Sequence, residues 1–346
     1  MAHAVVTGAS GLLGANLAAA LIAQGHTVTA TRRASTDTSS LADLPVKWVH
    51  ADLGSAAELR GVFAGADVVF HCAACVSTGR RVTAAMTAVN VGATGAVIEA
   101  AIAVGTPRLV HTATANTIGP TPDGTPADER TPWAMDEAGL ASGYAVTKRQ
   151  GENVVKRACD KLDAVIISPT YLVGPRDARP SSGRLIVEVA NRRIPYWTPG
   201  YNDFADVREV ARGMIAAWLR GKRGERYILG GEELTYRDYM ELVARVAGVD
   251  PPRRRLPYPV AWIGGKAGDL FEVVTRRETT VNSVSVRYAF TDRYRYSSDK
   301  AARELGYVAG PIEPAIRDAV KWFRARGMIR SGEMPRRHSA PRHTWR

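Results

Sequence analysis

The chain has 346 residues, of which 45% are hydrophobic and 23% charged, a composition that suits a protein with a sizeable folded core. Three cysteines are too few for a disulfide framework and favour a reducing, cytoplasmic location. The net charge of +12 raises the question of nucleic-acid binding, but eight basic residues and one acidic residue lie between positions 321 and 346. We therefore expect a basic, flexible tail over 326–346 and no nucleic-acid partner.

Short apolar segments alternate with helical ones along the first half of the chain. Strands are predicted over 4–7, 27–31, 46–49, 67–70, 108–112 and 164–168, with helices over 12–24 and 93–104. This alternation predicts an α/β fold built on a doubly wound parallel sheet. The first domain is expected to span 1–168 and to be rejoined by 203–229. A smaller substrate-binding region would comprise 169–202 and 230–325.

Two further observations concern partners. No apolar stretch reaches the length of a membrane span and the start lacks the pattern of a signal peptide, so we expect no membrane partner. The aromatic and basic segment 288–296 is predicted as a strand with alternating packing rather than as a surface for stacking nucleic-acid bases.

Glycines separate the first predicted strand from the first helix. Their spacing suits a tight turn, a close approach of backbone to a pyrophosphate, and close packing of the helix on the sheet. The N-terminus of the helix would then direct its unpaired N–H groups at the phosphates. The pattern predicts a Rossmann domain that binds a dinucleotide. The cofactor loop would consist of Gly8, Ser10, Gly11, Leu12, Leu13 and Gly14.

The end of the second predicted strand decides which dinucleotide binds. An acidic residue here would bind the ribose 2′-hydroxyl of NAD, but the segment carries Arg32 and Arg33, with no acid before Asp37. Two guanidinium groups suit a 2′-phosphate, which they bind through charge-assisted hydrogen bonds. NADP(H) is therefore favoured, and NAD(H) is the alternative.

A tyrosine and a lysine stand four residues apart on a predicted helix over 144–160. This spacing places Tyr144 and Lys148 on one face, where the ammonium group would lower the pKa of the phenol and fit it for general acid–base catalysis. Thr112 and Thr114 point to one side of the preceding strand, and either hydroxyl would hydrogen-bond a substrate oxygen.

Together these motifs resemble the extended short-chain dehydrogenase/reductase family, of the NAD-dependent epimerase/dehydratase type. The later segments 174–177, 224–230 and 299–306 resemble its dihydroflavonol-4-reductase-like branch and its hopanoid-associated sugar epimerases. The resemblance implies that Thr114 takes the place of the family's catalytic serine. It also implies cofactor contacts by Asp52, Leu53, Ala73, Lys148 and Pro169, and a homodimer formed through 82–104 and 144–160.

Three functions follow from this resemblance. We favour an NADP(H)-dependent reductase or secondary-alcohol dehydrogenase acting on a medium-sized organic molecule, in part because Ser168 stands where many sugar-nucleotide enzymes carry an arginine. The alternatives are a nucleotide-sugar 4-epimerase or dehydratase with retained NAD, and a non-catalytic NADP(H)-sensing regulator. Cys72 and Cys75 lack a second pair or a histidine at ligand spacing, so no metal site is expected.

Overall fold

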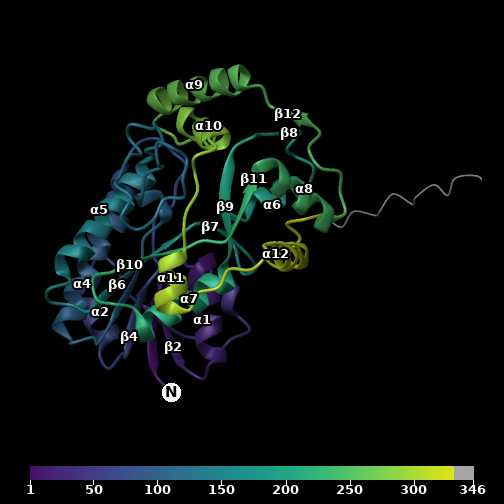
Figure 1. The fold of residues 1–346 in the computed structure, drawn as a ribbon. Helices are drawn as coiled ribbons and strands as arrows, with labels where there is room; N and C mark the ends of the chain where they lie inside the picture. The colour runs from purple at the N-terminus through teal and green to yellow at the C-terminus, as the bar shows by residue number, and fades with distance from the viewer. Residues whose placement is uncertain (331–346) are drawn as a thin grey trace, which may run out of the picture.

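A computed structural model describes residues 1–330 and contains a seven-stranded sheet in which every neighbouring pair of strands is parallel (Figure 1). The strand order is β10-β6-β5-β4-β1-β2-β3, so the direction of winding reverses between β1 and β4. This confirms the predicted fold class. The strands are β1 (His3–Thr7), β2 (Thr27–Arg32), β3 (Lys47–His50), β4 (Val68–His71), β5 (Leu109–Thr112), β6 (Ala164–Pro169) and β10 (Arg226–Leu229).

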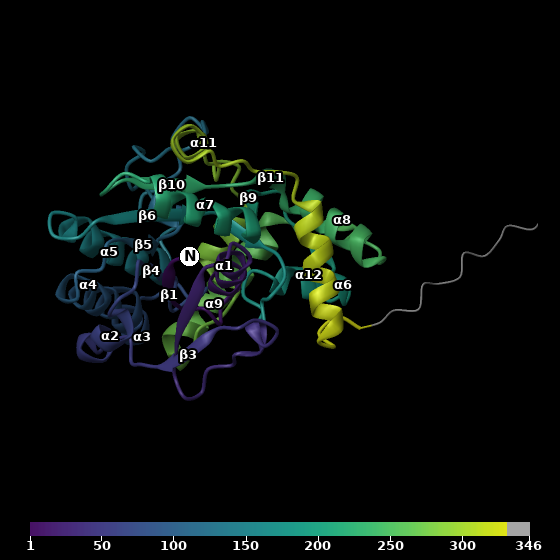
Figure 2. The same cartoon turned by 90° about the horizontal axis from the view of Figure 1, so that it is seen from below.

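Helices cover both faces of this sheet (Figure 2). All residues of β4, β5 and β6 are buried, as expected for strands between two helical layers. One layer contains α1 (Leu12–Ala23), α7 (Val207–Arg220) and α11 (Asp299–Leu305). The other contains α2 (Ala56–Phe63), α4 (Thr94–Ala103) and α5 (Gly143–Ala158).

A composite helix runs from Ala84 to Ala103 and consists of α3 (Ala84–Met86), a π-helical turn η2 (Thr87–Ala93) and α4. By length and composition it is the one segment of residues 1–330 that could cross a membrane. However, 44% of its most apolar window is buried inside the protein, where it packs on α2 and α5. Its apolar character therefore has an explanation in the packing of the sheet layer.

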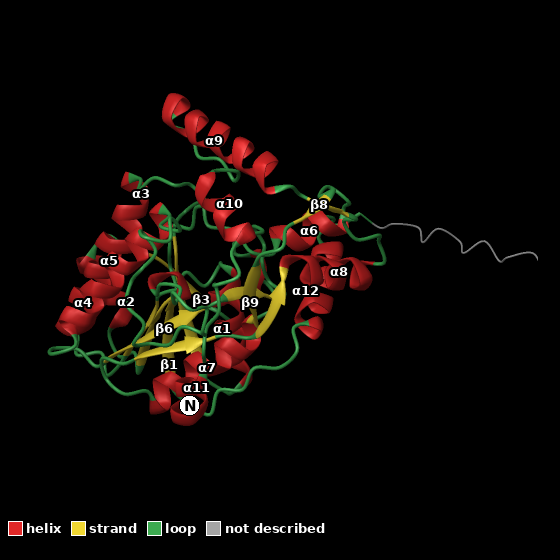
Figure 3. Cartoon of the chain, turned by 45° about the horizontal axis from the view of Figure 1, so that its top comes forward, coloured by secondary structure: helices red, strands yellow, loops and turns green. Residues whose placement is uncertain are grey.

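The remaining elements form a second region beside the carboxyl ends of the strands (Figure 3). It contains a three-stranded sheet, β11-β9-β7, and a two-stranded sheet, β12-β8. The strands are β7 (Tyr171–Val173), β8 (Tyr196–Trp197), β9 (Tyr201–Asp206), β11 (Glu232–Thr235) and β12 (Arg254–Arg255). The helices are α6 (Arg184–Ala190), α8 (Tyr236–Ala247), α9 (Tyr258–Thr275), α10 (Ser283–Phe290) and α12 (Glu313–Ala325), and short 3-10 turns η1 and η3 span Ser39–Leu41 and Ala115–Thr117.

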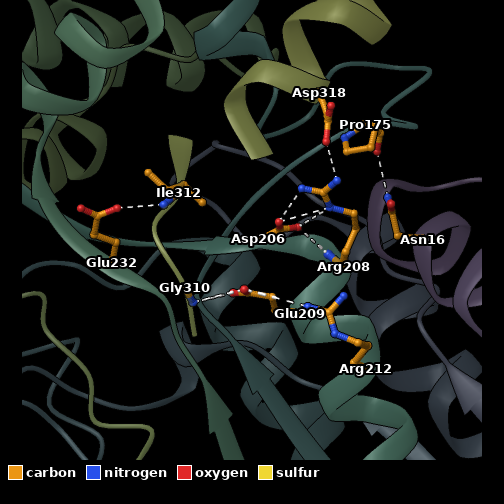
Figure 4. Close-up of polar contacts among 10 residues, drawn as sticks. All are labelled: Asn16, Pro175, Asp206, Arg208, Glu209, Arg212, Glu232, Gly310, Ile312 and Asp318. Carbon is orange, nitrogen blue, oxygen red and sulfur yellow. Dashed lines mark hydrogen bonds and ion pairs between the residues drawn. The ribbon is translucent and has the colours of Figure 1, made fainter. Parts of the chain in front are cut away.

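The segment 203–229 is shared between the two regions. Its first residues belong to β9 in the small sheet, whereas α7 packs on α1 and β10 pairs with β6 at the edge of the large sheet. Polar contacts join the regions around this segment (Figure 4). The Asn16 side chain donates to the Pro175 carbonyl over 2.8 Å, and the Gly310 and Ile312 N–H groups donate to Glu209 and Glu232.

We expect Asp206→Ala to lower the free energy of unfolding by about 2 kcal/mol. Asp206 caps α7 by accepting a hydrogen bond from the Arg208 N–H over 2.8 Å, and its carboxylate also pairs with the Arg208 guanidinium, which reaches Asp318. Denaturant unfolding of the wild type and the variant measures the loss. Asp206→Asn keeps a capping oxygen and serves as the control; equal losses in both variants would show that the cap contributes nothing.

Two predictions about the C-terminal half were wrong. The segment 288–296 is not a strand: its start completes α10, which a capping box between Asn282 and Ser285 initiates. Residues 326–330, which the sequence assigned to a flexible tail, are ordered: Ile329 is buried in the apolar cluster of the second region and Arg326 lies over the Trp322 ring at 4.0 Å. The rest of the predicted tail lies outside the described residues.

Candidate active site

The predicted cofactor loop lies between the carboxyl ends of β1 and β4, where the winding of the sheet reverses. Gly8 has a φ of +73°, and a Cβ atom there would lie 2.6 Å from the backbone nitrogen of Ala73. A Cβ atom on Gly14 would collide with the backbone of Gly8 and Ala9. These glycines therefore let the β1–α1 turn, the start of α1 and the segment after β4 pack together without side chains.

The N-terminus of α1 has room and donors for a phosphate group. Gly11 is the N-cap residue, so no side chain caps the helix, and a Cβ atom there would meet only the Gly8 carbonyl oxygen, at 3.4 Å. The Gly11 N–H bonds that same carbonyl, and Ser10, Leu12 and Leu13 complete the turn. Such an uncapped helix start with an open approach fits the pyrophosphate of a dinucleotide.

Arg32 and Arg33 lie at the carboxyl end of β2 with exposed side chains. Among the described residues neither guanidinium group takes part in an ion pair. The nearby carboxylate of Asp37 is engaged elsewhere: hydrogen bonds from Ser39 lower its pKa, as do the charges of Arg179 and Arg326. The two arginines are thus free to bind an anionic group.

Tyr144 lies in the first turn of α5, and its nearby hydroxyl partner is Thr114, which follows β5. The phenol is half-buried, and burial raises its pKa to about 12, while a side-chain hydrogen bond with Thr114 lowers it. The hydroxyl of Thr112 instead donates to the Cys72 sulfur over 3.5 Å. The structure therefore brings Thr114, and not Thr112, to the phenol. At neutral pH the tyrosine carries its proton and is a donor.

Lys148 lies one turn further along α5 and is 2% exposed. Its Nζ atom donates to the Thr112 carbonyl over 2.6 Å, and burial lowers its pKa to about 8, although Cys72 and Glu152 act in the opposite direction. The sequence spacing predicted that Lys148 would lower the pKa of Tyr144, but in the structure this pKa is raised. The reason is that the burial of Tyr144 dominates and the ammonium group is held by a backbone carbonyl.

Asn90 fixes the segment after β4 that contains Ala73. Its side-chain oxygen accepts from the Cys75 N–H over 2.8 Å, and its amide nitrogen donates to the Cys75 carbonyl and the Thr147 hydroxyl. The residue sits in the π-helical turn η2, and π-helical turns occur frequently at functional sites. Because Thr147 belongs to α5, Asn90 links the cofactor loop to the helix that carries Tyr144 and Lys148.

Sequence reasoning missed Glu152, which lies one turn beyond Lys148 and is 1% exposed. Its carboxylate pairs with Arg226 and Lys156 and accepts from the Thr117 hydroxyl over 2.7 Å. Burial raises its pKa, but the Arg226 charge and the lysine outweigh this and lower it overall. The group therefore ties α5 to η3 and β10. The sequence shows that Glu152 stands four residues after Lys148, but it does not show that Arg226, 74 residues away, is the partner of the carboxylate.

The other predicted cofactor contacts lie at the same edge of the sheet. Asp52 and Leu53 follow β3, and the Asp52 carboxylate accepts from the Gly54 N–H over 2.9 Å. Pro169 ends β6 and is buried. Burial raises the pKa of the Cys72 thiol to about 11, and residues 1–330 contain no cluster of His, Cys, Asp or Glu that could hold a metal ion.

Asp203 lies in β9 and is buried, and we expect it to make the stability of the protein depend on pH. Its carboxylate accepts from the Thr170 hydroxyl and the Gly231 N–H, yet burial raises its pKa from 3.8 to about 6. Since the folded-state pKa lies above the unfolded one, the contribution is complete below about pH 4 and is lost as the pH rises through 6, by about 2 to 3 kcal/mol. Asp203→Asn should remove this dependence in unfolding measured at pH 4.5 and 7. An unchanged difference between the two pH values would contradict the assignment.

Comparison with known proteins gives three similar relatives that match nearly the whole chain. The "Sterol demethylase protein B" of Methylococcus capsulatus is 35% identical over 94% of this chain and 99% of its own. A "Putative dihydroflavonol 4-reductase" of Synechocystis is 32% identical, covering 94% and 96%. A "4-hydroxy-2-methyl-3-oxo-4-farnesyl-3,4-dihydroquinoline-1-oxide ketoreductase" of Stigmatella aurantiaca is 30% identical, covering 96% and 98%.

Solved structures with the same fold and a family profile also match the chain. The crystal structure of gox2253 has a TM-score of 0.82 and 30% identity, covering 95% of this chain and all of its own. PA4631, a nucleoside-diphosphate-sugar epimerase from Pseudomonas aeruginosa, has a TM-score of 0.77 and 25% identity, covering 95% and 99%. The profile of the "NAD dependent epimerase/dehydratase family" matches residues 4–230.

Proposed function

The chain belongs to the NAD-dependent epimerase/dehydratase family and is an oxidoreductase of the extended short-chain dehydrogenase/reductase type. From this premise we propose that it uses NADP(H) to reduce a ketone, or to oxidise a secondary alcohol, in an apolar organic molecule. The observation that carries the proposal is the meeting of a protonated Tyr144 with the Thr114 hydroxyl beside the buried Lys148. The cofactor, when bound, would supply or accept the hydride.

The protein's own groups have separate roles in this proposal. The Tyr144 hydroxyl donates its proton to the substrate oxygen in reduction and takes it back in oxidation. The Thr114 hydroxyl bonds that oxygen and holds it near the phenol. Lys148, which the Thr112 carbonyl holds one turn away, would bind the nicotinamide ribose of the cofactor. Glu152, through its contacts with Thr117 and Arg226, positions α5.

The cofactor would lie along the carboxyl edge of the sheet. The uncapped start of α1 would bind the pyrophosphate, and Arg32 and Arg33 would bind the 2′-phosphate of NADP(H), for which their free guanidinium groups are suited. Asn90 would keep the segment at Ala73 in place against the nicotinamide half, facing Pro169.

An apolar substrate agrees with the surroundings of Tyr144. Three tyrosines pack edge to face: the ring centroid of Tyr294 lies 5.1 Å from that of Tyr288 and 5.2 Å from that of Tyr296. The Tyr294 hydroxyl also donates to the Asn116 side-chain oxygen. The buried Leu140, which packs with this group, also lines a cleft of about 530 Å³ with Tyr258 and Phe290, and the charged Glu137, Arg287 and Arg293 stand at the same cleft. Two of the relatives are named for a sterol and for a farnesyl-bearing ketone.

The testing experiment measures which cofactor binds and whether it is exchanged. Nucleotide released from purified protein is identified, NADP(H) and NAD(H) are titrated separately, and oxidation of NADPH is followed with sterol ketones and prenylated ketones. Weakly held cofactor, preference for the 2′-phosphate and turnover of such a ketone support the proposal.

A nucleotide-sugar epimerase is the second candidate, favoured by the 25% identity with PA4631. Two features disagree with it. Arg176, an arginine of the second region, pairs with Asp43 over 2.7 Å and donates to the Ser40 carbonyl, so its guanidinium group is not free to bind the diphosphate of a nucleotide sugar. Ser168 is fully buried, so its position has no space for an arginine. Tightly retained NAD together with no carbonyl reduction would make the epimerase the better assignment.

A further inference from the structure

Helix α9 presents its large apolar side chains to solvent and its small and polar ones to the protein. Ile263, Leu270 and Val274 are 70%, 64% and 73% exposed. They recur at intervals of seven and four residues, which puts them on one face over three turns of helix. The opposite face carries Gly265 and Glu272, and both are buried. This is the reverse of an ordinary surface helix.

Packing explains the inward face. A Cβ atom on Gly265 would lie 3.0 Å from the Val286 side chain and 3.1 Å from the Asn282 carbonyl, so α9 and α10 approach closely. The Glu272 carboxylate accepts from the Asn282 side chain and from the Thr279 N–H, both over 3.3 Å. The polar groups of the helix are thus satisfied toward the body. No comparable reason places the apolar groups outside.

The helix lies at the outer end of the second region, beyond α10, and the two views show no other described element over its outer side (Figures 1 and 3). Val260 and Phe271 extend the outward face and are 58% and 46% exposed. Contiguous exposed apolar side chains of this size mark a surface that another body covers.

Basic residues flank both ends of this face. Arg253, Arg254 and Arg255 precede the helix and Arg276 and Arg277 follow it, and all five are exposed. The nearby acidic groups have partners or are buried: Asp250 pairs with Arg253 over 3.6 Å, Asp269 accepts from the Ser283 N–H, Glu278 accepts from the Ser77 hydroxyl, and Glu272 is buried. An apolar strip between clusters of positive charge complements an anionic surface, and two copies of it would repel each other at both ends.

We propose that the outward face of α9 docks on the surface of an anionic lipid bilayer, with the helix lying in the plane of the interface. Ile263, Leu270 and Val274 would enter the boundary of headgroups and acyl chains, and the flanking arginines would contact anionic headgroups.

The prediction of no membrane partner rested on apolar stretches too short to span a membrane, and that criterion does not bear on this mode of binding. An interfacial helix needs a continuous apolar face and nearby positive charge, not a length of apolar sequence. The inference does not rest on the proposed function, because it uses only α9 and its neighbours.

The test is co-sedimentation of the full chain with vesicles of phosphatidylcholine alone and of phosphatidylcholine with phosphatidylglycerol. We expect binding to the anionic vesicles that weakens as salt is added. Leu270→Ser/Val274→Ser should lower the partition coefficient about tenfold or more, because the face loses two apolar side chains. The matched control is Leu219→Ser/Val308→Ser, which removes two equally exposed side chains, 63% and 76%, from other surfaces and should bind as the wild type does.

A second pair separates the charge contribution from the apolar one. Arg276→Ser/Arg277→Ser should weaken binding and reduce its dependence on salt, whereas Arg60→Ser/Arg157→Ser on α2 and α5 should not. Equal loss in test and control variants, or equal binding to both kinds of vesicle, would overturn the proposal. So would a wild-type dimer in sedimentation equilibrium that Leu270→Ser/Val274→Ser dissociates, since a second copy would then cover the face.

Discussion

Tyr144→Phe should lower kcat for carbonyl reduction about a thousandfold and leave the dissociation constant of NADPH within about twofold. Phenylalanine fills the same space but has no proton to donate to the substrate oxygen. Because the pKa of Tyr144 is about 12, the phenol is protonated throughout the neutral range. The variant therefore removes a proton donor that the wild type has at every neutral pH. Single-turnover oxidation of NADPH, monitored by absorbance, measures the effect on chemistry directly.

The companion threonines provide a matched control for this result. Thr114→Val removes the hydroxyl that lowers the pKa of the phenol and that is proposed to hold the substrate oxygen, so it should lower kcat about tenfold to a hundredfold. Thr112→Val removes a hydroxyl whose one hydrogen bond among the described residues goes to the Cys72 sulfur, and it leaves the carbonyl that holds Lys148, so its effect on kcat should be several times smaller. Tyr144→Phe with wild-type kcat, or a larger loss in Thr112→Val than in Thr114→Val, would refute the proposed roles.

The double variant Arg32→Ala/Arg33→Ala should weaken the binding of NADPH by about a hundredfold to a thousandfold, while the affinity for NADH changes little. Each lost charge-assisted hydrogen bond to the 2′-phosphate contributes about 1.5 to 3 kcal/mol. Because both guanidinium groups lack ion-pair partners among the described residues, removing them breaks no ion pair that would affect folding. Fluorescence titration with each nucleotide measures the two affinities.

Two controls make this prediction specific. Arg157→Ala removes another exposed arginine, on α5, and reports any general effect of reduced positive charge on anion binding. A thermal unfolding curve of the double variant without nucleotide should match that of the wild type. If the affinities for NADPH and NADH fall equally, the arginines do not bind the 2′-phosphate, and the proposed preference of the protein for NADP(H) is wrong.

The elements that depend on local signals were predictable from the sequence. The strand–glycine–helix pattern at Gly8 and Gly14 and the mostly apolar strands β4, β5 and β6 identify the fold, because each rests on neighbouring residues. The signal for α10 was equally local: the Asn282–Ser285 capping box was overlooked because the aromatic residues beyond it suggested a strand.

Other features depend on residues far apart in the chain and could not be predicted. The choice of Thr114 over Thr112 turns on where Cys72 lies, and the buried Glu152 is stabilised by Arg226 from another strand. The outward face of α9 is defined by what α10 leaves uncovered, which periodicity alone does not reveal. The residue types at these positions are visible in the sequence, but their contacts with distant residues become known only from the folded structure.

The position of β10 at the edge of the large sheet affects how the chain is made. During synthesis β6 is complete about sixty residues before β10 leaves the ribosome, a delay of several seconds. Throughout that interval the edge of β6 offers unpaired backbone groups to any other strand. The nascent protein therefore has a period of vulnerability to aggregation that ends when residues 226–229 dock, and a truncation before this point would make the vulnerability permanent.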